Sequence, residues 1–149
     1  MMVEGGCHCG LITYEAYIDP ETVCICHCTD CQRLTGTAFR TFVLTMEGGF
    51  KLLSGQLKSY IRVGESGARR VQTFCPECGS PIYSTSDGDD PKIYSLRTGT
   101  MRQRNELLPR AQIWTRSAQP WLGVLSTDIP GQEKQGDLAS ALNPRRHRS

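Results

Sequence analysis

The segment Cys24-Ile25-Cys26-His27-Cys28-Thr29-Asp30-Cys31 places four of the chain's eight cysteines close together. The other four lie in two shorter clusters, Cys7-His8-Cys9 and Cys75-Pro76-Glu77-Cys78. Cysteines one or two residues apart converge readily on one ion, whereas a disulfide needs particular Cα separations and side-chain directions. The three clusters therefore predict two metal sites, and the spacing must decide which cysteines form each one.

The composition of the chain limits the classes of protein to which it can belong. It has 149 residues, of which 38% are hydrophobic and 7% aromatic, so we expect one domain with a modest core that metal ligation helps to stabilise. A net charge of +2 is too small to indicate a nucleic-acid partner. No apolar run approaches the roughly 20 residues of a membrane span, and the first residues lack the features of a signal peptide. We therefore expect a cytoplasmic protein, in whose reducing surroundings clustered cysteines favour metal or redox chemistry over disulfides.

Short runs rich in β-branched and aromatic residues, separated by turn residues, predict a mainly β domain. One short helix is expected over residues 28–34, with Thr29 or Asp30 as its cap and Gly36 as its stop, and a turn is expected at residues 47–49. We expect a zinc-binding β domain over residues 1–126 and a polar tail over residues 127–149. The predicted strands cover residues 11–18, 39–46, 50–53, 57–63, 70–74, 81–84 and 92–96.

The first predicted metal site is a structural zinc site. Cys75 and Cys78 are followed by Gly79, an arrangement that resembles a zinc knuckle with two thiolates at a tight turn. The natural second pair is Cys7 and Cys9, because both pairs lie beside predicted strands. The long intervening segment is no obstacle, since the entropy of loop closure grows only slowly with loop length.

The remaining cysteines are Cys24, Cys26, Cys28 and Cys31, and all four could close a second site. If the chain is extended here, Cys24 and Cys28 lie about 13 Å apart, whereas two ligands of one zinc need Cα atoms within roughly 7 Å. Cys26, Cys28 and Cys31 can converge if a helix begins at Cys28, and Cys24 is then a buried or spare thiol. Three thiolates with an open fourth position are the pattern of a catalytic zinc.

Three motifs occur in order along the chain: Gly5-Gly6-Cys7-His8-Cys9-Gly10, Cys26-His27-Cys28-Thr29-Asp30-Cys31-Gln32-Arg33-Leu34-Thr35-Gly36 and Phe74-Cys75-Pro76-Glu77-Cys78-Gly79-Ser80. Together they resemble the glutathione-dependent formaldehyde-activating enzyme family, which also includes centromere protein V, over roughly residues 4–114. The resemblance implies a β-tent fold of antiparallel sheets. It also implies two zinc ions per chain, a structural one on Cys7, Cys9, Cys75 and Cys78 and a catalytic one on Cys26, Cys28 and Cys31. The implied activity is that of a carbon–sulfur lyase acting on S-hydroxymethylglutathione.

An open zinc site would suit a substrate thiol bound as its thiolate, which could attack a small aldehyde, and the reverse step cleaves the carbon–sulfur bond. Glutathione would need cations for its two carboxylates, and Arg33 and Arg40 are candidates because arginine can grip a carboxylate with two hydrogen bonds. His27 is a candidate proton carrier, or else a residue that packs behind the ligands. Further candidate cations for the carboxylates flank the loop at residues 64–67: Arg62, Arg69 and Arg70.

Two other functions are compatible with these residues. In the first, the second site is closed by Cys24 or unused, and the protein is a non-catalytic zinc-binding interaction module. In the second, the protein is a redox sensor in which Cys24 and the second cluster exchange zinc for a disulfide. The number of protein sulfurs at the second site distinguishes the enzyme from the interaction module.

Overall fold

The computed structural model describes residues 1–124, and the predicted tail over residues 127–149 lies outside them. The chain divides into one unit over Met1–Ala118 and a second that begins at Gln119, and the first unit is described here by itself. In it, a mainly β architecture with one short α-helix confirms the predicted fold class. The helix is α1 (Thr29–Thr35), and the strands are β1 (Met2–Gly6), β2 (Thr13–Ile18), β3 (Cys24–Cys26), β4 (Arg40–Ser54), β5 (Lys58–Val63), β6 (Arg69–Phe74), β7 (Pro81–Ser86), β8 (Ser95–Arg97) and β9 (Ala111–Ile113).

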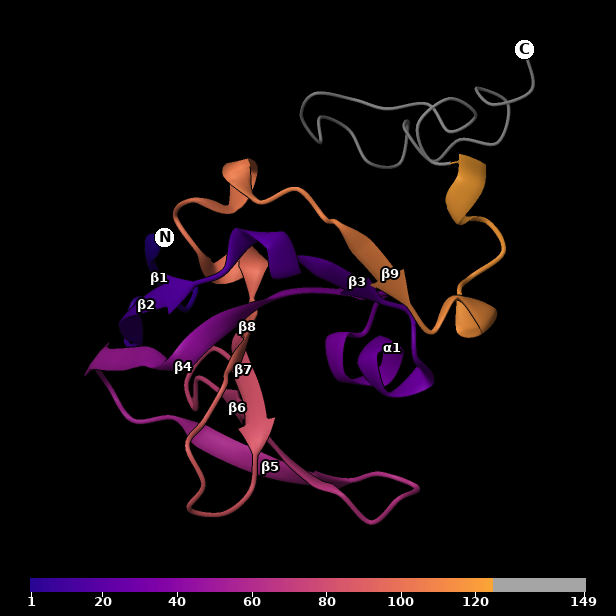
Figure 1. Cartoon of the computed structure of the whole chain (residues 1–149). Helices are drawn as coiled ribbons and strands as arrows, with labels where there is room; N and C mark the ends of the chain where they lie inside the picture. Colours follow the sequence, from indigo (N-terminus) through magenta and orange to yellow (C-terminus); the bar gives the residue numbers. More distant parts are fainter. Residues whose placement is uncertain (125–149) are drawn as a thin grey trace. The chain divides into compact units, whose positions relative to one another are not determined.

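The strands form one sheet in the order β1-β2-β4-β8-β7-β6-β5, and each neighbouring pair along this path is antiparallel. Strand β3 pairs antiparallel with β4 and parallel with β9, so one pairing departs from the antiparallel arrangement that was expected. Figure 1 shows β4 running beside β3 at one end and beside β2 at the other, with the hairpin β5–β6 on the opposite side of β7 and β8. The long strand β4 therefore connects the N-terminal hairpin to the region around α1.

The prediction of a turn at residues 47–49 is wrong, because β4 continues through this segment as a bulged strand. The pairing with β2 shifts here, since Ala16 is opposite Phe50 whereas Ile18 is opposite Thr45. Gly48 has a φ of 65°, a left-handed conformation that glycine adopts without a steric cost. The extra residues are accommodated as an irregularity that bends the strand, and the chain does not reverse.

The core lies between β2, β4, β7 and β8. On β2 the buried side chains alternate as a strand requires, with Tyr14, Ala16 and Ile18 directed inward. The Tyr14 hydroxyl also hydrogen-bonds to the Thr100 hydroxyl at 2.7 Å, so the one polar atom of this buried ring has a partner. The other core side chains are Val3, Ile12, Val23, Val43, Cys75, Ile82, Leu96, Met101 and Leu107.

Helix α1 begins at a cysteine. The cap is Cys28, whose sulfur accepts a hydrogen bond from the Cys31 N–H, and not Thr29 or Asp30 as the sequence suggested. Asp30 instead forms an ion pair with Arg62 of β5. The helix ends at Gly36 with a φ of 68°, as predicted. Capping by Cys28 turns the first helical turn and its cysteines toward the end of β3.

Candidate metal centres and the cavity beside them

The first cysteine cluster has the geometry of a closed tetrahedral metal site. The sulfur atoms of Cys7, Cys9, Cys75 and Cys78 all lie within 4.8 Å of one another. The Cys7–Cys9 and Cys9–Cys75 sulfur separations are 3.6 and 3.7 Å. Four thiolates around zinc at about 2.3 Å would stand about 3.8 Å apart, so this donor set fits zinc.

Two turns shape this first cluster. The Ile12 N–H donates to the Cys7 sulfur at 3.2 Å, a contact that favours a thiolate. In the other turn, Gly79 has a φ of 79°, so a glycine is needed directly after the second cysteine pair. The backbone N–H of His8 donates to the Ser80 hydroxyl at 3.1 Å and joins the two turns.

The second cluster contains three cysteines from two elements. Cys26 ends β3, Cys28 caps α1 and Cys31 lies in the first turn of α1, and their sulfur atoms lie within 4.8 Å of one another. Cys24 is buried on β3 outside this group, and its thiol donates to the Ile25 carbonyl at 3.6 Å. Among the described residues, the cluster therefore offers three sulfur ligands and leaves the fourth position of a tetrahedral ion to another molecule.

The thiols of the second cluster differ in acidity. Burial raises the pKa of Cys26 to about 12. For Cys28 burial also acts to raise the pKa, but hydrogen bonds from the Cys31 N–H and from the neighbouring thiols outweigh it, so the pKa is lowered. Burial raises the pKa of Cys31, and the positive charge of Arg40 acts in the opposite direction. These directions describe the thiols without an ion, because a coordinated cation deprotonates its thiol ligands.

His27 lies between two of these cysteines and faces away from them. Its ring is 3% exposed, and Nε2 hydrogen-bonds to the Gln112 side-chain oxygen at 2.7 Å. Nδ1 has no partner among the described residues, and the ring packs near Phe39 with 5.9 Å between centroids. The ring is not part of the cavity wall described next, so its proposed role as a proton carrier stays a prediction.

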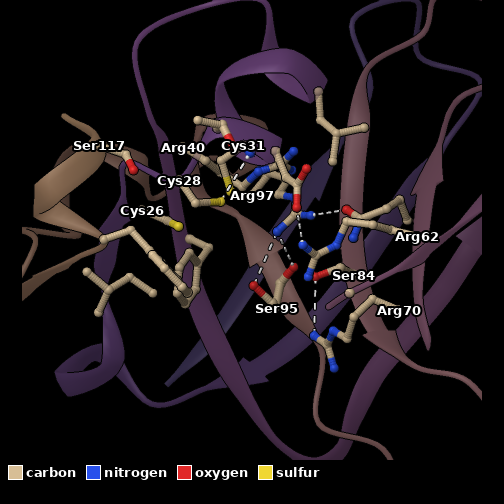
Figure 2. Close-up of a pocket in the computed structure, with 18 of the residues that line it drawn as sticks. Cys26, Cys28, Cys31, Arg40, Arg62, Arg70, Ser84, Ser95, Arg97 and Ser117 are labelled. Carbon is tan, nitrogen blue, oxygen red and sulfur yellow. Dashed lines mark hydrogen bonds and ion pairs between the residues drawn. The ribbon is translucent and has the colours of Figure 1, made fainter. Parts of the chain in front are cut away.

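A cavity of about 800 Å³ opens beside the second cluster. Figure 2 shows the three cysteines on one side of it, Arg62 and Arg70 on the other, and Arg40 and Arg97 next to the cysteines. Of the arginines considered from the sequence, Arg33 and Arg69 do not line the cavity; Arg33 is exposed and Arg69 pairs with Asp87 on the surface. The arginines that do line the cavity are Arg40, Arg62, Arg70, Arg97 and Arg116.

Two of these guanidinium groups are deeply buried. Arg40 is 5% and Arg97 is 8% exposed, and the Nε atom of each lacks a hydrogen-bond partner within residues 1–124. Arg97 donates to Ser95 at 3.2 Å and to the Gln72 side chain at 2.8 Å, both neutral acceptors. Burial, together with the charge of Arg40, lowers the pKa of Arg97 to about 9, so Arg97 is still protonated at neutral pH.

An aromatic residue with an unusual backbone lies at the wall of the same cavity. Trp114 directly follows β9 and has a φ of 56°, a left-handed conformation that is uncommon for a bulky residue. The guanidinium carbon of Arg116 lies 4.8 Å from the centroid of its ring, which is a cation–π distance. Backbone strain of this kind is concentrated at functional sites, and here it accompanies an aromatic ring that contacts Arg116 at the cavity wall.

The chain matches one protein family over most of its length. Residues 2–117 match the family described as glutathione-dependent formaldehyde-activating enzyme. The chain belongs to this family. The resemblance noted from the three sequence motifs is thus confirmed, and the match covers the sheet, both cysteine clusters and the cavity of this family member. No curated protein matches the chain.

A solved structure also resembles this member of the formaldehyde-activating family. It is the crystal structure of a Rhodobacter sphaeroides protein, determined as a structural genomics target, with a TM-score of 0.56 and 19% sequence identity. The likeness covers 73% of this chain and 98% of that one, and at this identity it shows the fold alone. Within residues 1–124 no helix is long and apolar enough to cross a membrane.

Proposed function

We propose that this protein is a zinc-dependent carbon–sulfur lyase-like enzyme that acts on thiol adducts of small aldehydes, such as S-hydroxymethylglutathione. The observation that carries the proposal is the second cysteine cluster, which has three sulfur donors and forms one wall of a cavity of about 800 Å³. A site closed by four protein sulfurs would serve structure alone, whereas three donors beside a cavity suit a site that accepts a substrate. Membership of the family supports the same reaction class.

The two clusters have separate roles in this proposal. The four-sulfur cluster holds a structural zinc, and its residues are Cys7, Cys9, Cys75 and Cys78. Cys26, Cys28 and Cys31 hold a second, catalytic zinc. When bound there, zinc lowers the pKa of a substrate thiol and so provides a thiolate at neutral pH. We place the protein in the cytoplasm, where thiol substrates stay reduced.

The proposed reaction joins a thiol and an aldehyde and needs no further reactant. In the synthetic direction the substrate sulfur bonds to the aldehyde carbon, the carbonyl π bond opens, and the proton lost by the thiol ends on the new hydroxyl. In the lyase direction the carbon–sulfur bond breaks and the same proton returns to sulfur. The three-cysteine site would hold the substrate sulfur in one place, and the cavity would hold the aldehyde next to it. The two reactants would then meet in a fixed orientation.

The test is the exchange rate between free glutathione and S-hydroxymethylglutathione, measured by exchange NMR with zinc-loaded protein and formaldehyde. The proposal predicts faster exchange than in buffer, and loss of the acceleration in Cys28→Ser. Cys24→Ser is the matched control, because Cys24 lies on the same strand as Cys26 but outside the cluster. Protein that neither binds glutathione nor changes the exchange rate would overturn the glutathione reaction.

A further inference from the structure

The arginines in the cavity outnumber the groups that could neutralise them. Five arginines line it, whereas its carboxylates are Asp30 and Glu65, and Asp30 is already paired with Arg62. Zinc with three thiolates carries a formal charge of −1. The cavity lining therefore has a formal excess of about two positive charges, which an anionic ligand would neutralise.

Two of the five arginines, Arg40 and Arg97, are buried, so their positive charges are energetically unfavourable without an anion nearby. Arg40 is 5% exposed, and its Nε has no hydrogen-bond partner among the described residues. The acceptors of Arg97 are neutral side chains and a carbonyl, and Arg70 donates only to the Ser84 hydroxyl at 3.3 Å. A buried charge with no carboxylate beside it is unfavourable, so the buried Arg40 and Arg97, with the half-buried Arg70 on the same wall, indicate a place for an anion.

The anion and the reacting sulfur belong to one small molecule or one small adduct. Arg40 and Arg97 line the same cavity as Cys26 and Cys31, so the cations lie on the wall that also contains the cluster. Figure 2 shows Arg40 and Arg97 beside the three cysteines, with Arg70 further along the wall. An anion held by Arg40 and Arg97 is therefore within reach of a sulfur bound at the cluster.

We infer that the substrate carries a carboxylate, which Arg40, Arg97 and Arg70 bind while its sulfur is held at the three-cysteine cluster. A thiolate supplies one negative charge and a carboxylate the second, which matches the excess of the wall. A phosphate dianion with a thiolate would exceed it. The planar carboxylate also suits the fork of a guanidinium. This deepens the proposed function and relies on it for the reaction, but the binding of the carboxylate does not depend on catalysis.

The binding test compares two thiols of similar size, mercaptoacetate and 2-mercaptoethanol, by calorimetric titration of the zinc-loaded full chain. We expect mercaptoacetate to bind at least about tenfold more tightly, because it adds charge-assisted hydrogen bonds. Equal affinities, or no binding of either thiol, would overturn the inference.

Substitutions of arginines inside and outside the cavity show whether the preference for mercaptoacetate comes from the carboxylate site or from the overall charge of the protein. Arg40→Met should reduce the preference for mercaptoacetate to about one while binding of 2-mercaptoethanol persists. It should also leave the ligand-free protein folded, because the Arg40 Nε makes no hydrogen bond that the substitution would break. Arg97→Gln is the second variant, and Arg69→Gln is the control, since Arg69 lies outside the cavity and pairs with Asp87. A preference that survives both cavity substitutions would contradict the inference.

Two further mixtures show which reactant carries the carboxylate. Mercaptoacetate with formaldehyde places it on the thiol, and 2-mercaptoethanol with glyoxylate places it on the aldehyde. We expect the protein to accelerate adduct exchange in one of these mixtures well above that of 2-mercaptoethanol with formaldehyde. A preference in binding with no acceleration in any mixture would retain the carboxylate site and reject the lyase, whereas equal acceleration in all three would retain the lyase and reject the carboxylate site.

Discussion

The substitutions Cys7→Ser and Cys28→Ser should differ in their effect on stability. Both side chains are half-buried, and the sulfur of each accepts one backbone N–H, from Ile12 and from Cys31. Serine preserves the size and an acceptor in each case, so the pair isolates the loss of a metal ligand. Cys7 and Cys28 belong to clusters whose ligands are separated by very different numbers of residues along the chain.

The expected difference follows from the spacing of the ligands. Cys9 and Cys75 are 66 positions apart, whereas Cys26 and Cys31 are only five positions apart. In the unfolded chain the local cluster can still gather around an ion, but the distant ligands rarely meet. Loop-closure entropy makes this gathering less favourable for the long loop by about 2 kcal/mol. An ion that also binds the unfolded chain stabilises the fold less. Loss of the long-range site should therefore lower the free energy of unfolding by about 2 kcal/mol more than loss of the local site.

Thermal and urea unfolding of zinc-loaded protein would measure this difference. For a unit of this size, about 2 kcal/mol corresponds to a melting temperature lower by about 10 °C in Cys7→Ser than in Cys28→Ser. Cys28→Ser should keep most of the stability and lose the proposed activity. If Cys28→Ser unfolded at the same temperature as Cys7→Ser or below it, the division into a structural and a catalytic site would be refuted.

Further changes test the core and the metal dependence. Leu96→Ala removes a side chain that is 0% exposed on β8 and should cost about 2–5 kcal/mol in urea unfolding; a loss under about 1 kcal/mol would contradict the assigned core. Gly5→Ala should cost about 1–3 kcal/mol, because a Cβ there would overlap the Tyr14 ring and lie 2.6 Å from the Thr100 carbonyl oxygen, and an unchanged melting temperature would refute this packing. Tyr14→Phe should cost about 1 kcal/mol by removing the hydrogen bond to Thr100, which thermal unfolding can resolve. A strong chelator should lower the melting temperature, and added zinc should restore it; no response to the chelator would contradict metal-stabilised folding.

The grouping of the cysteines was predictable because it depends on local geometry. In an extended strand Cys24 is too far from Cys28 to share an ion with it, and the structure leaves Cys24 out of the second cluster. The helix start at Cys28 followed from the polar residues after it, although the cap is the cysteine itself. The prediction that Cys7 and Cys9 share a site with Cys75 and Cys78 needed only the assumption that the flanking strands bring the two pairs together.

The arginine wall could not be predicted, because it depends on the order of the strands. Arg40, Arg70 and Arg97 lie on β4, β6 and β8. These strands are brought together by the pairings of β4 with β8, of β8 with β7 and of β7 with β6. Arg97 follows a run that reads as an ordinary buried strand, with no local sign of a cavity. Strand β9 is three exposed residues long, too short for a sequence pattern. The sequence does not distinguish the bulge at Gly48 from a turn, because a glycine with positive φ serves either structure.

The central claim is that three protein sulfurs hold a second zinc with an open position. Elemental analysis with X-ray absorption, on the wild type and on Cys24→Ser, tests it most directly. The account predicts two zinc ions per chain, an averaged shell that mixes sulfur with a lighter atom, and the same spectrum after Cys24→Ser. A shell of sulfur alone that changes in Cys24→Ser would mean a site closed by Cys24, and the proposed reaction would have no place to occur.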